Sequence, residues 1–421
     1  MDISRRRIRP KTTGQPPKPP HDGSLEAFIR LEASGRGIQL SRLGPAVLAH
    51  LDYRLEAEIK NGALRAFWKH HQLPARPEQL VASPRPRHYR TTSKRRCLPG
   101  SGGFGKRKNA TEAIFATTGE SSLLEPGEHA AIYAAVEGLL ARVEFSPLAR
   151  ALNFVVIRGT YDEFMVIFNL QALDRGLHRL LLRAASGLQA LEANIVSAFL
   201  FLDPSRSPYY LESERPRGSF PIKRIFGPER FRLRLGESVF SVPPTSFSQV
   251  NESILPLLLD HVRSLTAGEN GGRLLDLYCG YGLFSLSLRD RYREIFAVDA
   301  AEGSIRAAGD MLPRFPGGAR VHFRSAAILR NSLERLLPPP LPPGDEDVIL
   351  DPPRSGAGEA VIASIARRRP GRALHLFCAA DEMPAAIGNW RRHGYFVRRV
   401  VPLDMFAGTT QLEILVLLTR A

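Results

Sequence analysis

The sequence has few cysteines and no long apolar run. Its 421 residues include only three cysteines, Cys97, Cys279 and Cys378. They lie far apart, without a CxxC pair or a histidine at metal-ligand spacing, which argues against a disulfide framework and against a zinc site. This usage is typical of the reducing cytoplasm. No run approaches the roughly 18 apolar residues of a membrane span, so we expect a globular protein without a metal or a membrane partner.

The first 22 residues lack apolar positions at regular spacing. They are basic and proline-rich, and no apolar segment follows their charges as it would in a signal peptide. A stretch without apolar residues to bury cannot form a core. We therefore expect residues 1–22 to form a disordered basic tail.

Acidic residues are outnumbered by basic ones. The chain has 58 Lys plus Arg against 42 Asp plus Glu, a formal net charge of +16, which favours a polyanionic partner such as nucleic acid. Residues 83–109 carry nine Lys or Arg and no acid. A solvated loop is one interpretation, but a stretch of one charge sign is better explained by phosphate contacts. The residues predicted to contact RNA are Arg85, Arg87, Arg90, Lys94, Arg95, Arg96, Lys106, Arg107 and Lys108.

The segment before residue 241 mixes helical and strand patterns. Apolar residues recur at helical spacing from Val47 to Trp68, and further helices are indicated near 127–142 and 174–191. LNFVVIRGTYDEFMVIFNL predicts two strands around a turn, NIVSAFLFL a third strand, and FRLRLGESVFSV a hairpin. We therefore expect residues 23–240 to form an α+β region that binds RNA.

Residues 241–421 instead alternate strands and helices. Helical segments separate the first six predicted strands, which is typical of a parallel, doubly wound sheet. Only ten residues join the last two strands, too few for a helical crossover, so the final strand should be antiparallel. The predicted strands are 273–280, 294–300, 319–325, 345–351, 372–378, 395–401 and 412–420.

Ligand-binding residues follow the first two strands of this domain. Gly280 and Gly282 form a turn in which backbone amides can approach a ligand, although such turns also occur without one. Asp299 ends the second strand, where an acid can accept hydrogen bonds from ribose hydroxyls. The alternative is that Asp299 caps the helix expected from Gly303.

Reactive side chains come at the ends of the later strands. Asp351 and Arg354 leave the fourth strand in DPPRSG, where two prolines impose a rigid, extended exit. Cys378 ends the fifth strand, and Glu413 begins the antiparallel last strand. Because these ends meet at one edge of the sheet, the four side chains should converge in one crevice. The alternative for Cys378, a packed core thiol, does not require that convergence.

DLYCGYGLFSLSL, DPPRSG, the cysteine after a strand and LDMFAGTTQLEILVLLTR together resemble the RNA uracil-5 methyltransferase family. PPTSFSQVN at 243–251 resembles the element just upstream in that family, and SPRPRHYR at 83–90 resembles part of its N-terminal region. The resemblance is strong over 243–421 and patchy before it. It implies a Rossmann-like class I methyltransferase domain and methyl transfer from S-adenosylmethionine to C5 of a uridine in tRNA or rRNA.

The resemblance also implies roles for individual residues. Cys378 would add to C6 of uracil, Glu413 would remove the C5 proton, and Asp351 and Arg354 would orient the ring. The residues implied for the cofactor site are Gln249, Tyr278, Gly280, Gly282, Asp299 and Asp351. Neither the N-terminal β-barrel nor the four-cysteine iron–sulfur site of some members is visible. We therefore expect no iron–sulfur cluster, and we favour tRNA slightly over rRNA as the substrate. We also expect a monomer.

The sequence departs from the family pattern beside these residues. Ala379 and Ala380 replace an Asn-Pro pair, Gln411 replaces a histidine, Leu283 replaces Asn or Thr, and Ala326 and Ala327 stand where an acid is expected. A catalytically impaired member acting as a non-enzymatic RNA-binding or RNA-folding protein is therefore the alternative. Arg354 after the prolines argues against an amino-methyltransferase, which usually has an aromatic residue there. The lack of a second cysteine near the fourth strand argues against a cytosine-5 methyltransferase.

Overall fold

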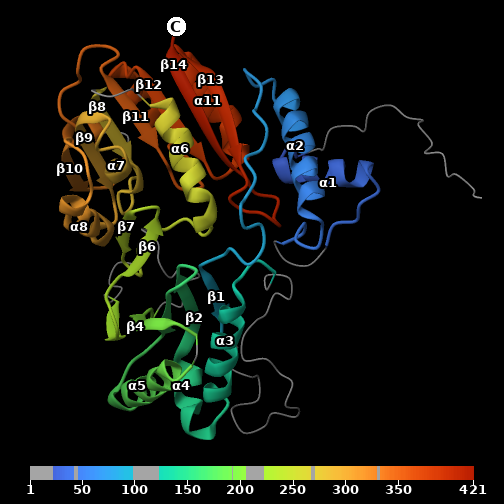
Figure 1. Cartoon of the computed structure of the whole chain (residues 1–421), viewed down its shortest axis with the longest axis vertical. Coiled ribbons are helices and arrows are strands. Elements are labelled where there is room, and N and C mark those ends of the chain that lie inside the picture. Colours follow the sequence, from blue (N-terminus) through green and yellow to red (C-terminus); the bar gives the residue numbers. More distant parts are fainter. Residues whose placement is uncertain are drawn as a thin grey trace, which may run out of the picture.

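The structure is a computed structural model that describes residues 22–41, 46–97, 123–191, 193–204, 222–266, 271–329 and 332–421. It contains a seven-stranded sheet, a five-stranded sheet and a two-stranded hairpin (Figure 1). Among the described residues, no helix has both the length and the apolar character needed to cross a membrane. Apart from Asp22, the expected tail at 1–22 lies outside the described residues.

The seven-stranded sheet has the predicted doubly wound topology. Its strand order is β10-β9-β8-β11-β12-β14-β13, and β8 to β12 are parallel neighbours. The last strand, β14, pairs antiparallel with both β12 and β13, which confirms the expectation drawn from the short connection before it. The strands are β8 (Gly271–Leu277), β9 (Tyr292–Asp299), β10 (Arg320–Ser325), β11 (Glu346–Leu350), β12 (Arg372–Phe377), β13 (Tyr395–Leu403) and β14 (Glu413–Arg420).

Helices cover both faces of this sheet. Along β14, Ile414 and Val416 belong to one hydrophobic cluster and Leu415 and Leu417 to the other, as the two-residue period of a strand buried on both faces requires. The first cluster includes residues of α9 (Leu333–Leu336), α10 (Glu359–Arg367) and α11 (Met383–Arg392). The second includes residues of α6 (Leu255–Leu265), α7 (Leu283–Ser287) and α8 (Glu302–Met311).

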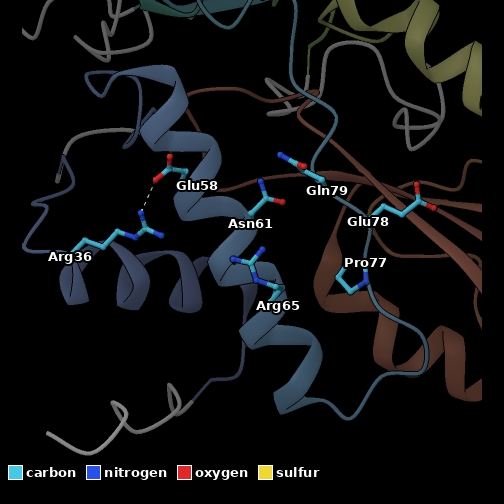
Figure 2. Close-up of a pocket in the computed structure, with 7 residues that line it drawn as sticks. All are labelled: Arg36, Glu58, Asn61, Arg65, Pro77, Glu78 and Gln79. Carbon is cyan, nitrogen blue, oxygen red and sulfur yellow. Dashed lines mark hydrogen bonds and ion pairs between the residues drawn. The ribbon is translucent and has the colours of Figure 1, made fainter.

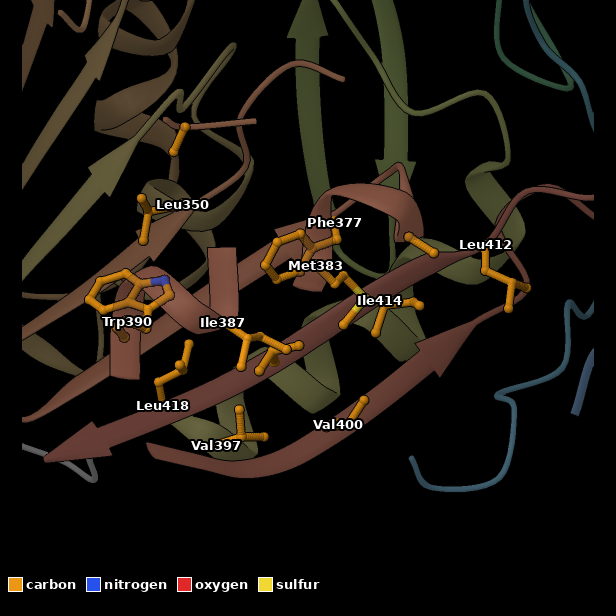
Figure 3. Packing of buried hydrophobic residues seen from close by; sticks show 14 of the residues in the cluster. Leu350, Phe377, Met383, Ile387, Trp390, Val397, Val400, Leu412, Ile414 and Leu418 are labelled. Carbon is orange, nitrogen blue, oxygen red and sulfur yellow. The ribbon is translucent and has the colours of Figure 1, made fainter. Parts of the chain in front are cut away.

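Helix α11 shows how local sequence spacing builds the first cluster. Met383, Ile387 and Trp390 recur at the spacing of one helix face. They pack with Ile414 and Leu418 of β14 (Figure 3). This packing holds the chain that follows Cys378 against the sheet.

The five-stranded sheet lies below the first in Figure 1 and has its own helices. β2 and β3 form the predicted antiparallel pair, and α5 provides the crossover between the parallel strands β3 and β4. Its strands, in spatial order, are β1 (Ser93–Arg96), β2 (Leu152–Gly159), β3 (Phe164–Leu170), β4 (Ile195–Leu202) and β5 (Lys223–Phe226). Its helices are α3 (Gly127–Leu140), α4 (Ser146–Ala151) and α5 (Arg175–Gln189).

The segment 23–240, expected as one region, contributes to several hydrophobic cores. Helices α1 (Leu25–Gly35) and α2 (Tyr53–His70) share a cluster with α10, α11 and β13 of the seven-stranded sheet. The hairpin β6 (Phe231–Leu235) and β7 (Ser238–Val242) packs with α6 and with one face of the five-stranded sheet. The other face of that sheet forms a separate cluster with α3, α4 and α5.

Candidate active site

The ends of β12 and β14 bring Cys378 and Glu413 together. Phe377 of β12 pairs with Ile414 of β14, so the next antiparallel position places Cys378 beside Glu413. Asp351 follows β11, the parallel neighbour of β12. The charges of Glu413, Asp351 and Arg354 all act on the Cys378 thiol. The four side chains expected to converge therefore lie at one edge of the sheet.

The electrostatics of this edge favour protonated acids. Burial raises the pKa of Cys378 to about 12, and the negative charges of Glu413 and Asp351 add to that effect, whereas Arg354 opposes it. Glu413 is 0% exposed, and neither of its carboxyl oxygens has a hydrogen-bond partner among the described residues. Burial, with the charge of Asp351, raises its pKa well above the usual value. A carboxyl held in this way binds a proton strongly.

The loop after β8 has an open backbone next to an acid. Gly280 adopts φ +54°, and a Cβ atom added there would meet nothing within 4 Å, so a ligand can approach its backbone. Its amide donates to Oδ2 of Asp299 over 2.9 Å, and Oδ1 of Asp299 accepts from the Ala301 amide over 2.7 Å. The hydrogen bonds of Asp299 therefore connect the glycine loop to the end of β9. Helix α8 begins three residues later, at Glu302.

Gly282 and Tyr278 also have positive φ angles in this loop. Gly282 has φ +83°, and a Cβ atom there would lie 3.1 Å from Ala308 of α8 and 3.2 Å from Phe323 of β10, so this glycine lets the turn pack closely against both elements. Tyr278 is half-buried and also has a positive φ, +64°, which is uncommon for a residue with a side chain. Tyr278, Gly280 and Gly282, at alternate positions, all have a left-handed backbone, which fixes the shape of this loop.

Gln249 lies in a segment that several elements hold in place. The buried Arg158 of β2 donates to the Pro244 carbonyl over 2.6 Å and to Oγ of Ser248 over 2.8 Å. Oγ of Ser246 lies 2.6 Å from Oγ of Ser304 on α8. The five-stranded sheet and α8 thereby fix the segment directly before Gln249, which is itself buried.

Asp276 belongs to this site, and sequence reasoning missed it. Its Oδ2 accepts hydrogen bonds from the amide and hydroxyl of Ser285, over 2.9 and 2.5 Å, while Oδ1 has no partner among the described residues. Burial raises the pKa of Asp276 to about 7, and Asp299 adds to that shift. Burial, with the charges of Asp276 and Asp299, does the same to Asp351. An acid between two leucines of a strand, four residues before Gly280, was the available signal.

Two of the predicted RNA-binding residues form internal ion pairs. Arg87 donates to Glu56 over 2.8 Å and to the backbone carbonyls of Ala49 and Leu51. Arg95 pairs with Glu125 over 2.5 Å, and both side chains are largely buried. These two guanidinium groups therefore help to hold the fold together.

The other predicted RNA-binding residues differ in their contacts and exposure. The guanidinium of Arg85 lies 4.1 Å from the centroid of the Tyr161 ring, and Nε of Arg90 donates to the Thr92 carbonyl. Lys94 and Arg96 are exposed on β1. The predicted contacts Lys106, Arg107 and Lys108 lie outside the described residues.

A hollow beside α2 contains none of the predicted site residues (Figure 2). It encloses about 370 Å³ between α1, α2 and the segment 77–79. Arg36 and Glu58 pair across it over 3.1 Å, and Glu78 pairs with Arg399 over 2.7 Å. Its lining is Arg36, Glu58, Asn61, Arg65, Pro77, Glu78 and Gln79. Since these charges largely satisfy one another, we assign the hollow no catalytic role.

Known proteins resemble this chain in sequence. Residues 226–312 match the family model described as tRNA (Uracil-5-)-methyltransferase. An uncharacterized RNA methyltransferase of Thermotoga maritima is 29% identical over 274 residues, 64% of this chain and 58% of that protein. The 23S rRNA (uracil(1939)-C(5))-methyltransferase RlmD of Alkalilimnicola ehrlichii is 33% identical over 178 residues, 42% of this chain and 39% of that protein. The chain thus covers only about 40 to 60% of these relatives.

A solved structure shares the fold. The tRNA (uracil-54, C5)-methyltransferase of Pyrococcus abyssi, solved in complex with S-adenosyl-L-homocysteine, matches with a TM-score of 0.65 at 21% identity. The match covers 90% of this chain and 85% of that one. The predicted class I methyltransferase fold and the resemblance to RNA uracil-5 methyltransferases are both confirmed.

Proposed function

Because the chain resembles RNA uracil-5 methyltransferases in sequence and in fold, we propose that it transfers a methyl group from S-adenosylmethionine to C5 of a uridine in structured RNA. The observation that carries the proposal is the pair formed by Cys378 and Glu413. A thiol and a buried carboxyl, which has no hydrogen-bond partner among the described residues, lie side by side at the carboxyl edge of the sheet. Covalent addition to a ring followed by removal of a ring proton needs these two groups.

The residues beside this pair suit the cofactor. S-adenosylmethionine, when bound, supplies a methyl group on a positively charged sulfonium and also carries an ammonium group. The carboxyl groups of Asp276, Asp299 and Asp351 influence one another electrostatically, so they lie close enough to offer a site for positive charge. The open backbone at Gly280 and the fixed segment around Gln249 would hold the rest of the molecule.

Cys378 would act as the nucleophile. Its thiol must first lose its proton, a step that burial opposes and that the positive charge of Arg354 favours. The thiolate then forms a bond to C6 of uracil, and the electron pair of the C5–C6 double bond makes C5 nucleophilic. After methylation, C5 carries both the methyl group and its original proton.

Glu413 would act as the base. Burial and the charge of Asp351 raise its affinity for a proton, so Glu413 must first be ionised, and it then binds the C5 proton strongly. The electron pair of the broken C–H bond restores the C5–C6 double bond and expels the thiolate of Cys378. Cys378 is then a thiolate and Glu413 carries the proton taken from C5. Passage of this proton from Glu413 to Cys378 restores the starting state, so each turnover releases one proton, the one that Cys378 lost at first.

The proposed substrate is a nucleotide that can leave its stack. A uracil ring can reach Cys378 only if it is unstacked, so a nucleotide of a loop is a better target than one within a helix. We place tRNA first because the matching family model is described as tRNA (Uracil-5-)-methyltransferase, and rRNA second because RlmD is named as a 23S rRNA enzyme.

Product analysis tests the proposed function. The chain is incubated with S-adenosylmethionine carrying a labelled methyl group and with tRNA transcripts or 23S rRNA fragments, and the RNA is digested to nucleosides. We expect label in 5-methyluridine, identified by mass spectrometry. Label in 5-methylcytidine, or RNA binding without label in either RNA, would reject the proposal, and the second result would favour the non-enzymatic RNA-binding alternative.

We predict that the exposed cations of β1, Lys94 and Arg96, contribute to RNA binding. Replacing Lys94 and Arg96 with glutamine should weaken RNA binding and reduce the salt dependence of the affinity, by about 1 to 2 in the slope of log K against log salt. The dissociation constant measured at several salt concentrations gives this slope. Arg391→Gln is the control, because this exposed residue lies at the end of α11 away from Cys378. An unchanged slope in the double variant would remove β1 from the RNA interface.

A further inference from the structure

The loop that leads to Glu413 is buried along most of its length. Residues 404–412 join β13 to β14, and Glu413 follows directly. Asp404, Met405 and Ala407 are each 0% exposed. Connecting loops normally run over the surface, because their backbone groups need water. The surroundings of this loop must therefore satisfy its polar groups.

Lys60 of α2 supplies the central contact. Its Nζ lies 2.7 Å from Oδ1 of Asp404 and 2.7 Å from Oε1 of Glu56, and it donates to the Phe406 carbonyl over 3.4 Å. The side chains of Lys60, Glu56 and Asp404 are all 0% exposed. Burial by itself would lower the pKa of Lys60, but the charges of Asp404 and Glu56 raise it. Lys60 is therefore a buried cation between two buried acids.

The same N-terminal segment also holds the tip of the loop. The Gly408 amide donates to Oε1 of Glu56 over 2.5 Å, and the Tyr89 hydroxyl donates to the Ala407 carbonyl over 2.8 Å. Gly408 has φ +84°, and a Cβ atom there would lie 2.6 Å from a methyl group of Leu124. The tip thus has one shape, which depends on contacts with residues more than 280 positions earlier in the chain.

The helix pair α1 and α2 reaches the Cys378 side as well. The Leu25 amide, at the start of α1, donates to Oδ1 of Asp381 over 2.9 Å. Asp381 lies in the short turn that follows Cys378. The same two helices therefore contact the chain directly after Cys378 and the loop directly before Glu413.

We propose that Lys60 is a positioning residue, which holds the loop 404–412 so that the Glu413 carboxyl faces C5, the ring carbon next to the one attacked by Cys378. This inference rests on the proposed function. It adds a residue, Lys60, that the reaction requires although it lies outside the cofactor and RNA sites. Lys60 touches neither substrate nor cofactor in this proposal. Its effect passes through Asp404 and Phe406 to the backbone that ends at Glu413.

The order of the chemical steps distinguishes a misplaced Glu413 from a protein that is merely less stable. The bond between Cys378 and C6 forms before Glu413 acts, and it breaks only after the C5 proton has left. A misplaced Glu413 should therefore leave methylated RNA attached to the protein. A protein that is merely unstable would lose the covalent complex and the turnover together.

The test compares Lys60→Met with Lys69→Met, an exposed lysine of the same helix. With ordinary uridine in tRNA and S-adenosylmethionine, we expect Lys60→Met to lose about 100-fold in turnover, the effect of a misplacement of about 1 Å. We also expect it to accumulate a covalent protein–RNA complex that survives denaturation, whereas Lys69→Met should behave as the wild type. If Lys60→Met does not fold, Asp404→Asn removes the same link to the loop and should give the same trapped complex.

Hydrogen exchange gives a second measurement that does not depend on activity. Amides of residues 404–413 should exchange faster in Lys60→Met than in the wild type, while those of β9 keep their rates. Unchanged exchange in 404–413, or a loss of turnover without a trapped complex, would overturn the positioning role. If the wild type forms no 5-methyluridine, the proposed function fails by itself, and the exchange rates alone decide whether Lys60 holds the loop.

Discussion

Replacing Cys378 with alanine should abolish methylation, with a loss of at least about 10⁴-fold in turnover, as when a nucleophile is removed. Without the thiol no bond to C6 can form, and C5 stays a poor nucleophile. The measurement uses RNA in which uridine is replaced by 5-fluorouridine, whose C5 fluorine cannot leave as a proton. With S-adenosylmethionine, the wild type should form a covalent complex that survives denaturation, and Cys378→Ala should form none.

Cys97→Ala provides the matched control. Cys97 is a buried thiol of the α3–α5 core, and burial raises its pKa to about 12, the same value as for Cys378. Burial raises the pKa of both thiols, and the two cysteines differ in their position in the fold. A covalent complex that persists in Cys378→Ala, or one that disappears in Cys97→Ala, would contradict the assignment of Cys378 as the nucleophile.

Replacing Glu413 with glutamine should stop the reaction after methyl transfer. The amide has nearly the same shape but cannot take the C5 proton, so we expect turnover to fall by about 10²- to 10⁴-fold, the usual contribution of a general base. Unlike Cys378→Ala, this variant should hold methylated RNA in a covalent complex even with ordinary uridine. Denaturing gel electrophoresis with labelled methyl groups detects that complex.

The same variant should be more stable than the wild type at high pH. The folded state raises the pKa of Glu413 above its usual 4.5, so above that pH the folded chain binds a proton that the unfolded chain does not. Stability then falls as pH rises, by up to about 1.4 kcal/mol per pH unit until the folded pKa is reached. Glutamine removes this dependence.

Urea unfolding at pH 5 and pH 8 measures the difference. The advantage of Glu413→Gln over the wild type should be larger at pH 8 than at pH 5. An advantage that is equal at both values would show that Glu413 does not titrate in the folded state as its burial requires. Gln411→Glu is a useful comparison, because it places a carboxyl two residues away at a half-buried position.

Two of the residues that depart from the family pattern pack in hydrophobic cores. Ala380 is buried in the cluster that joins α1, α2 and α11 to the sheet, and Ala379 precedes the short turn that leads into α11. Leu283 begins α7 and packs in the opposite cluster. At Ala380 and Leu283, an apolar side chain therefore contributes to a hydrophobic core. The sequence pattern alone did not distinguish these packing roles from the loss of polar contacts.

Much of the catalytic domain could be predicted because its signals are local. Alternating strands and helices, and apolar residues on both faces of a strand such as β14, are readable within short windows. The short connection before β14 requires an antiparallel strand whatever the rest of the chain does. From strand direction it follows that Cys378, Glu413 and Asp351 meet at one edge.

The roles of the charged residues depend on partners far away in the sequence. The one-signed stretch 83–109 suggested that Arg87 and Arg95 contact RNA, but the acids that pair with them lie 31 and 30 positions away. Asp276 was missed because its importance comes from Asp299 and Asp351, which only the folded sheet brings near.

The sequence by itself determined the alternating fold, the direction of the last strand and the meeting of Cys378 with Glu413, since each of these follows from spacing along the chain. Only the tertiary structure decided which charges are internal and how the loop before Glu413 is held. Lys60 and Asp404 are 344 positions apart, and no local pattern relates them. Their contact exists because α2 packs beside β13, and burial then leaves an ion pair as the favourable way to keep both charges.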